Sequence, residues 1–423
     1  MAIRANCLAR GYSGVRPELV QLLVDCLEHD ITPLIPERGS VGASGDLVPL
    51  CYLAAMLIGE GDVLYGGKRI TAGAALAAAG LRPITLEAKE GLALINGTSF
   101  MAAYAVLALQ EATELAYAAE LCTALASQVL LGNHAHFAEF LERQKPHPGL
   151  AASAATVRTL LAGSRLGDPD RRSGPAAVNG FRELDVPIQD RYSVRCAPHV
   201  IGVLRDTMGW VESWLTAEIN SSTDNPLFDI DADLVHSGGN FYGGHVGQAM
   251  DALKLAVASV GDLLDRQLEL VVDEKFNRGL TPNLIPRVAD HDWAAGLHHG
   301  FKGMQITASA LAAEALKLTN PATAFSRSTE AHNQDKVSMG TIAARDARDI
   351  GELVAQVTAI QLLALCQAAD LRGPELLSPA TRAVHVHIRD RVSFVDQDRR
   401  MDGDITAIVA QIRSGALRNV SSF

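Results

Sequence analysis

The sequence predicts a mainly α protein, a bundle of long helices with a small mixed α/β region at the N-terminal end. Hydrophobic residues make up 48% of the 423-residue chain and aromatic residues only 5%, so Ala and Leu supply most of the core. This mixture favours helix packed on helix over a β-rich core. The stretch Ser99–Leu131 contains neither Pro nor Gly and is long enough to span a bundle. The predicted helices exceed the ~11–12-residue mean, which suits helices buried on most sides, including against other subunits.

The N-terminal region, residues 1–98, mixes short elements. Pro17–Leu27 has the pattern of an amphipathic helix that ends before Pro33. Val63–Ile70 predicts a two-stranded hairpin with Gly66-Gly67 at its turn.

Helical periodicity dominates after residue 98, and Pro- or Gly-containing segments end each helix. The expected long helices are Ser99–Leu131, His199–Asn220, Phe241–Val271, Leu297–Thr319 and Thr341–Leu371. Residues 168–180 have the composition of an exposed loop. No repeat or flexible linker divides the chain. We therefore expect a single domain over 1–423, in which residues 1–98 precede a central bundle of 99–371 and a C-terminal region of 372–423.

Charge and cysteine usage exclude several classes of partner. The net charge is −11 and no block of Lys or Arg appears, which argues against nucleic acid and anionic membrane surfaces. The six cysteines are scattered without C-x-x-C spacing, so we expect no disulfide framework, no metal site and a reducing cytoplasmic location. The N-terminus has no apolar signal core, and no uninterrupted apolar run reaches ~18 residues, so we expect no transmembrane helix.

The motif with the most chemical content is Gly39–Leu50, which contains the triad Ala43-Ser44-Gly45. If the Gly45 nitrogen attacks the Ala43 carbonyl carbon, a five-membered ring closes. Loss of water from that ring and from the Ser44 side chain leaves a conjugated methylidene-imidazolone, an electrophile that the standard side chains do not supply. The alternative is a Gly-rich turn followed by a helix at Asp46, and for the triad alone this alternative is the stronger.

The longer string resembles the prosthetic-group loop of the aromatic amino acid ammonia-lyase and aminomutase family, with phenylalanine ammonia-lyases as the nearest type. Further segments match that family in order along essentially the whole chain: Gly91–Thr98, Tyr192–Pro198, Thr223–Leu227, Gly238–Gly243, Gly300–Gly303 and His332–Gly340. The fumarase and aspartase superfamily, also helical tetrameric lyases, is disfavoured because its Gly-Ser-Ser-x-Met-Pro loop is absent.

The resemblance implies a helical homotetramer with shared active sites and the electrophile at helix N-termini. The electrophile is 4-methylidene-imidazol-5-one, formed autocatalytically from residues 43–45, with no external cofactor. Convergent helix N-termini create a positive potential, which favours an anionic ring and a substrate carboxylate. The implied reaction removes ammonia from a small aromatic L-amino acid and gives an arylacrylate. The ring adds covalently to the amine and makes it a better leaving group, and a base must reach the β-hydrogen.

The resemblance also assigns site residues. Tyr192 is placed beside the prosthetic group, where the alternative is a core tyrosine. Arg195 is expected on the same face as Tyr192. Its planar guanidinium suits a bidentate hydrogen-bonded pair with the substrate carboxylate, and Gln189 completes this polar cluster. Asn96 is expected to contact the ring or the substrate amine, and a role as a helix N-cap is compatible with this.

Further assignments concern substrate binding. Asn225 is expected to bind the carboxylate, against the alternative of a turn residue, and Phe241 to lie beside the ring, against the alternative of a core residue. Lys302 and the Glu330, Asn333 and Gln334 group match the phenylalanine type. Histidine-specific members usually carry an apolar residue at the lysine position and a glutamate where Gln334 stands. We therefore expect an uncharged aromatic substrate side chain, with phenylalanine or tyrosine as the leading candidates.

The sequence departs from the family in one respect, because the triad begins at residue 43 instead of well inside the chain. The family's mobile loop with a second tyrosine, generally taken as the β-proton base, is not found before it. A misassigned start or a fragment is one explanation, and a shortened paralogue is another. Three functions follow: an ammonia-lyase, a 2,3-aminomutase that returns ammonia to the β-carbon, and an inactive structural or regulatory subunit.

Overall fold

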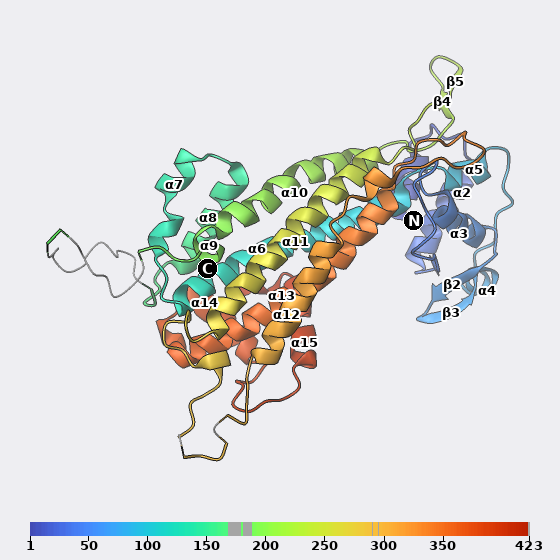
Figure 1. The fold of residues 1–423 in the computed structure, drawn as a ribbon. Helices are drawn as coiled ribbons and strands as arrows, with labels where there is room; N and C mark the ends of the chain where they lie inside the picture. Colours follow the sequence, from blue (N-terminus) through green and yellow to red (C-terminus); the bar gives the residue numbers. More distant parts are fainter. Residues whose placement is uncertain (168–178, 181–187, 290, 295, 422–423) are drawn as a thin grey trace. The chain divides into compact units, whose positions relative to one another are not determined.

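The computed structural model describes residues 1–167, 179–180, 188–289, 291–294 and 296–421. The chain divides into two compact units. The first contains Met1–Leu109, Trp210–Ala252 and Asn320–Arg348, and the second contains Gln110–Gly209, Leu253–Thr319 and Asp349–Phe423. Most described elements are helices, which confirms the predicted mainly α class (Figure 1). The expected domain boundaries stay a prediction.

Four long helices contribute residues to both units, and they correspond to four of the predicted ones. Their observed bounds are Ser99–Val129 for α6, Ala197–Ile219 for α10, Gly244–Val272 for α11 and Gly340–Arg372 for α13. The fifth predicted helix is α12, which begins at Lys302, later than expected, and ends at Lys317. The exposed loop expected at residues 168–180 falls outside the described residues except for its last two positions.

The first unit contains the short N-terminal elements. The hairpin is confirmed, because Val63 of β2 pairs with Ile70 of β3 and the strands are joined at Gly66-Gly67. A third strand, β1, pairs with β2. α4 packs on the β2–β3 hairpin (Figure 1). The elements of this unit are α1 (Ala2–Ala9), α2 (Pro17–Glu28), β1 (Thr32–Pro33), α3 (Leu47–Leu57), β2 (Asp62–Tyr65), β3 (Lys68–Thr71), α4 (Ala72–Ala78), α5 (Glu90–Ile95), β4 (Leu227–Asp229), β5 (Leu234–His236) and η3 (Ala322–Phe325).

One apolar cluster holds this region together. Leu23 of α2, Leu53 and Met56 of α3, and Leu94 of α5 are all essentially inaccessible to solvent and belong to it. Burying side chains of this size contributes roughly 1.5–3 kcal/mol each. The cluster therefore fixes α3 and α5, the helices that flank the motif at residues 43–45 and Asn96.

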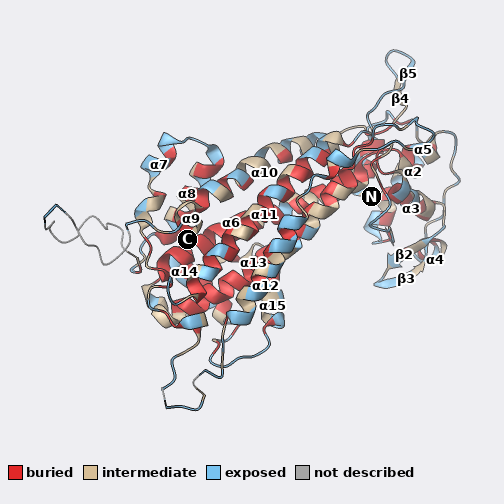
Figure 2. Cartoon of the chain, in the orientation of Figure 1, coloured by how far each residue is buried: buried red, intermediate tan, exposed pale blue. Residues whose placement is uncertain are grey.

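The second unit contains the remaining helices. They are α7 (Glu139–Gln144), α8 (Pro148–Leu161), α9 (Tyr192–Arg195), α12, α14 (Pro379–Arg389), α15 (Asp402–Arg413) and α16 (Ala416–Ser421), with the 3₁₀ turns η1 (His134–Phe137), η2 (Pro282–Leu284) and η4 (Pro374–Leu376). Buried residues run along the length of α13 (Figure 2). Among the described residues, α13 is the one helix long and apolar enough to cross a membrane, but 78% of its most apolar window is buried in the protein, as expected of a core helix.

An ion pair between the half-buried Arg16 and the buried Glu90 anchors the start of α5. Arg16 donates from Nε and Nη2 to the two carboxylate oxygens of Glu90, at 2.9 and 2.8 Å, and the Glu87 N–H donates at 2.8 Å. The Glu90 side chain is only 1% exposed. The Arg16 hydrogen bond is the main cause that lowers the pKa of Glu90 to about 2.

We predict that Glu90→Gln destabilises the protein at neutral pH by roughly 1.5–3 kcal/mol, the range for hydrogen bonds to a charged group. Because the folded-state pKa is depressed, this contribution is present above the unfolded value of about 4.5 and is lost as the pH falls through about 2. Chemical denaturation of both proteins between pH 7 and pH 3 should show the difference shrinking towards acid. An equal difference at every pH would contradict this account.

Candidate active site

A hollow of about 550 Å³ lies in the first unit, where several loops meet α5. Its lining brings together seven of the predicted site residues: Ala43, Ser44, Asn96, Asn225, Phe241, Asn333 and Gln334. The other lining residues, for which the sequence alone predicts no role, include Leu92, Tyr242, Asp335, Lys336 and Val337.

The triad forms a tight turn that is braced by Gly97. The Gly97 N–H donates to the Ser44 carbonyl at 3.2 Å, and the Gly97 carbonyl accepts from the Asp46 N–H at 2.7 Å. Gly45 and Gly97 thus form an isolated parallel bridge. Ser44 has φ +50° and Gly45 has φ +74°, so both residues adopt the left-handed region.

No side chain fits at either glycine of this bridge. A Cβ on Gly45 would overlap the Gly97 carbonyl, and a Cβ on Gly97 would overlap the Arg4 guanidinium and the Thr223 carbonyl. Gly97 also has φ +153°, which L side chains rarely adopt. Close backbone approach therefore requires glycine at both positions.

The Ser44 hydroxyl faces Gln334. The Gln334 side-chain amide donates from Nε2 to Ser44 Oγ at 3.0 Å, and the backbone of Gln334 forms a bridge with Thr329. Glu330 and Asn333 lie in the turn between these bridge residues, where the Asn333 N–H donates to the Glu330 carbonyl at 2.9 Å. Asn333 lines the hollow, whereas Glu330 is exposed and does not.

Two asparagines connect the other walls. Asn96 donates from Nδ2 to the Asn225 carbonyl at 2.8 Å, and Asn225 Oδ1 accepts from the Gly238 N–H at 2.6 Å. Asn96 is the residue after the last turn of α5, so its expected role as a helix N-cap is wrong. It is 3% exposed, and its Oδ1 has no hydrogen-bond partner among the described residues. An unpartnered buried acceptor at the wall of a hollow is a position for an N–H donor from a ligand.

Helices begin next to the lining loops. α3 starts after the triad, α6 after Asn96, α11 after Phe241 and α13 after the segment that carries Gln334. Backbone N–H groups at helix N-termini favour negative charge nearby. The anion-binding role expected of these N-termini stays a prediction.

Asp46 supports the triad from within the protein. Its carboxylate is fully buried and accepts hydrogen bonds from the Thr341 hydroxyl, from Ser40 Oγ at 2.9 Å and from the Met101 N–H at 2.8 Å. Burial is the main cause that raises its pKa to about 6, although the three hydrogen bonds act in the opposite direction. From the sequence, Asp46 is predicted only as the start of a helix, because one aspartate in an N-cap position gives no signal of burial.

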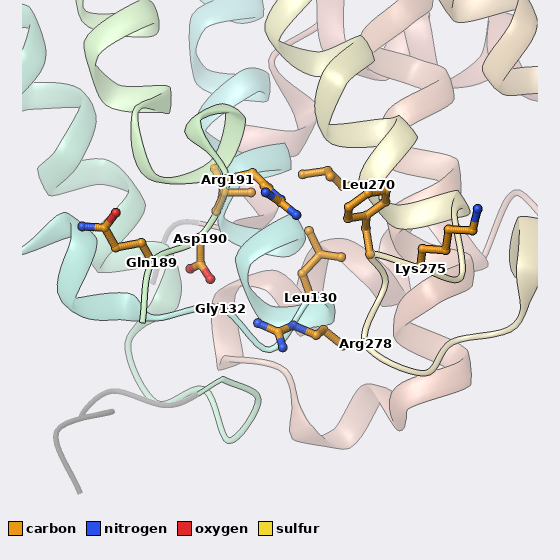
Figure 3. Close-up of a pocket in the computed structure, with 10 residues that line it drawn as sticks. Leu130, Gly132, Gln189, Asp190, Arg191, Leu270, Lys275 and Arg278 are labelled. Carbon is orange, nitrogen blue, oxygen red and sulfur yellow. The ribbon is translucent and has the colours of Figure 1, made fainter. Parts of the chain in front are cut away.

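The remaining predicted site residues belong to the second unit. Arg195 lies over the ring of Tyr192 at 4.7 Å, which confirms that the two share one face of α9. Tyr192 is 72% exposed, and the Arg195 Nε is buried without a partner among the described residues. Gln189 lines a neighbouring hollow whose other lining side chains include Arg191, Lys275 and Arg278, as Figure 3 shows.

Lys302 is the first residue of α12 and is exposed. It lines an open hollow of the second unit with Ile306, Asp398, Arg399 and Ile405. The structure therefore places Lys302 among both charged and apolar side chains and leaves its expected role in substrate binding a prediction.

The residues of the turn fit the prosthetic group expected from the sequence. Among the hydrogen bonds of the described chain, none occupies the Gly45 N–H or the Ala43 carbonyl, the two groups that ring closure would join. The Ser44 hydroxyl that would leave is already held by Gln334. Within the described residues, no group of three or more His, Cys, Asp or Glu side chains could hold a metal ion.

Comparison with known proteins identifies the family. The family described as "Aromatic amino acid lyase" matches residues 1–390, and the chain belongs to it. It is 40% identical over 419 residues to a histidine ammonia-lyase of Stigmatella aurantiaca, covering 99% of this chain and 78% of that protein. It is 43% identical over 432 residues to a tyrosine ammonia-lyase of Cupriavidus metallidurans, covering 99% and 79%. The crystal structure of a tyrosine aminomutase from Streptomyces globisporus is 36% identical with a TM-score of 0.91, covering 99% and 79%.

We predict that Gly97→Ala disrupts the site, because the new methyl group overlaps both the Arg4 guanidinium and the Thr223 carbonyl. Melting temperature should fall by several degrees, which is the effect of about 1 kcal/mol or more, and catalytic activity should be lost. The matched control is Gly67→Ala in the β2–β3 turn, where φ is +73° and nothing lies within 4 Å of the added Cβ. If both variants retained the same activity, the brace at Gly97 would not be required.

Proposed function

We propose that this protein is an ammonia-lyase that uses a 4-methylidene-imidazol-5-one, formed autocatalytically from Ala43, Ser44 and Gly45, to remove ammonia from an aromatic L-amino acid. The observation that carries the proposal is the braced turn. Among the described residues, neither the Gly45 N–H nor the Ala43 carbonyl has a hydrogen-bond partner, and the Ser44 hydroxyl beside them is held by Gln334. When present, the ring supplies an electrophile that activates the amino group as a leaving group.

The side chains around the hollow would bind and orient the substrate. The unpartnered Asn96 Oδ1 is positioned to accept a hydrogen bond from an N–H of the ring or of the substrate amine. Asn225 and the nearby helix N-termini favour the carboxylate. In this proposal Arg195 contributes the bidentate carboxylate grip, Gln189 completes its polar cluster, and Tyr192 lies beside the prosthetic group.

Family members act on small amino acids and typically form homotetramers, and we propose the same assembly here. Under this arrangement the cluster around Tyr192 completes a site that contains the triad of another subunit. The high exposure of Tyr192 in the isolated chain supports this assignment, because it leaves the phenol accessible to another subunit. We further propose that the enzyme works in the cytoplasm.

An uncharged aromatic side chain is the substrate class we favour. Gln334 offers a neutral amide beside Ser44, and apolar side chains of Leu92, Phe241 and Val337 line the hollow. An aryl ring would bury its surface against these groups. Phenylalanine and tyrosine are therefore the leading candidates, and Lys302 would contribute as in the phenylalanine type.

Histidine is the second candidate. Histidine ammonia-lyases are among the most similar relatives, and Asp335 places a carboxylate at the hollow that could pair with an imidazole. An aminomutase reaction on an aromatic amino acid is a third possibility, since the structural relatives include tyrosine and phenylalanine aminomutases. An inactive structural or regulatory role is the alternative of a different class.

We predict that the purified protein converts phenylalanine or tyrosine to the arylacrylate faster than it converts histidine to its product. Side-by-side assays that follow the acrylate and the β-amino acid separately test this. Histidine as the best substrate would overturn the substrate class, and β-amino acid as the main product would move the enzyme to the aminomutases. Absence of turnover with all three would favour the inactive alternative.

Two variants control this assay. Ser44→Ala should fold but lose turnover with every substrate, because its side chain cannot lose water. Gln334→Glu should raise the ratio of histidine to phenylalanine turnover by about tenfold, as expected for one new charge-assisted hydrogen bond. An unchanged ratio would show that Gln334 does not contact the substrate side chain.

A further inference from the structure

A buried carboxylate lies directly behind Asn225. Asp224 is fully buried, its Oδ1 accepts from the Asn225 N–H at 2.7 Å, and its Oδ2 accepts from the Lys89 ammonium at 2.6 Å. Asp224 is therefore the link between the backbone of Asn225 and a cation on a separate segment of the chain. Neither residue of this pair lines the hollow.

Lys89 is held in an unusual backbone conformation. It precedes α5 with φ +73°, in the left-handed region that costs energy for a residue other than glycine. Its side chain is 12% exposed, and the ammonium also donates to the Ser13 carbonyl at 3.3 Å. A lysine at a position better suited to glycine points to a requirement for its side chain.

The other end of α5 is tied to the same loop. Arg4, which is fully buried, donates from Nη1 to the Asn96 carbonyl at 2.9 Å and to the Thr223 carbonyl at 3.3 Å. Lys89 and Arg4 thus connect the beginning and the end of α5 to consecutive residues, Asp224 and Thr223. The hydrogen bond from Asn96 Nδ2 to the Asn225 carbonyl joins the same helix and loop.

We propose that Lys89 and Asp224 are positioning residues: their ion pair fixes the loop at 223–226 against α5, so that the side chains of Asn96 and Asn225 face the same hollow. Without the Lys89 charge, the Asn225 N–H would be the remaining hydrogen-bond donor to Asp224 among the described residues. A buried carboxylate that loses its cation draws in water or shifts its backbone. The loop would then release Asn225. The catalytic consequence of this proposal rests on the proposed function, in which Asn225 binds the substrate carboxylate.

The test compares Lys89→Met with Arg16→Met. Both changes remove the cation that pairs with a buried carboxylate near the start of α5, but only Lys89 reaches the loop at 223–226. Hydrogen exchange of the Asn225 and Gly238 amides, measured by NMR or on peptides, should accelerate by about tenfold or more in Lys89→Met and remain unchanged in Arg16→Met. Lys89→Arg, which keeps the charge, should restore most of the protection of these amides from exchange. It is also the variant to compare with wild type if Lys89→Met folds poorly.

The kinetic test separates positioning from general stability. Lys89→Met should raise KM by about tenfold with a smaller effect on kcat, whereas in an Asn225→Ala background it should change KM by less than about twofold, because both changes act on one contact. If Lys89→Met changed KM equally in the wild-type and Asn225→Ala backgrounds, the proposed role of Lys89 in substrate binding through Asn225 would be wrong. Unchanged exchange at 225 and 238 would overturn the positioning itself, and this readout holds even if the wild-type protein shows no lyase turnover.

Discussion

The candidate active site depends on the contact between two glycines, Gly45 and Gly97. Their backbones approach so closely that a Cβ on either residue would overlap other atoms. In this contact Gly97 forms hydrogen bonds with the Ser44 carbonyl and the Asp46 N–H. The two groups that would form the ring have no hydrogen-bond partner in the described part of the chain. The apolar cluster of α2, α3 and α5 positions both partners of this contact, so the chemistry of the turn follows from packing elsewhere in the first unit.

Buried charge organises the walls around this contact. Arg4, Lys89 and Asp224 lie behind the asparagines that line the hollow, and Asp46 lies behind the triad. Each of these charges has hydrogen-bond partners that compensate much of its desolvation, as buried ionic groups require. The side chains that face the ligand space are instead neutral amides and apolar groups, together with the exposed Asp335 and Lys336. This division separates the residues that hold the site from those that would contact a substrate.

Much of this architecture could be predicted from the sequence. Hydrophobic periodicity, together with Pro or Gly residues at the ends of elements, located α2, the hairpin and the long helices, because these signals are local in the sequence. The family motifs brought Ser44, Asn96, Asn225 and Gln334 together, which no local signal could do. The supporting residues were missed because their roles depend on burial: a single Arg4 or Lys89 in a sequence is ordinarily a solvated surface cation. The prediction that Asn96 caps the N-terminus of a helix was wrong, because the next helix starts later, at Ser99.

The central claim is that the turn at residues 43–45 becomes an electrophile. The most direct test is the mass of the purified chain, and of the peptide that contains Ala43, Ser44 and Gly45, measured by mass spectrometry. The account predicts a mass lower than that of the sequence by two water molecules, with the loss confined to that peptide and absent from Ser44→Ala. A folded protein whose peptide has the unmodified mass would contradict it.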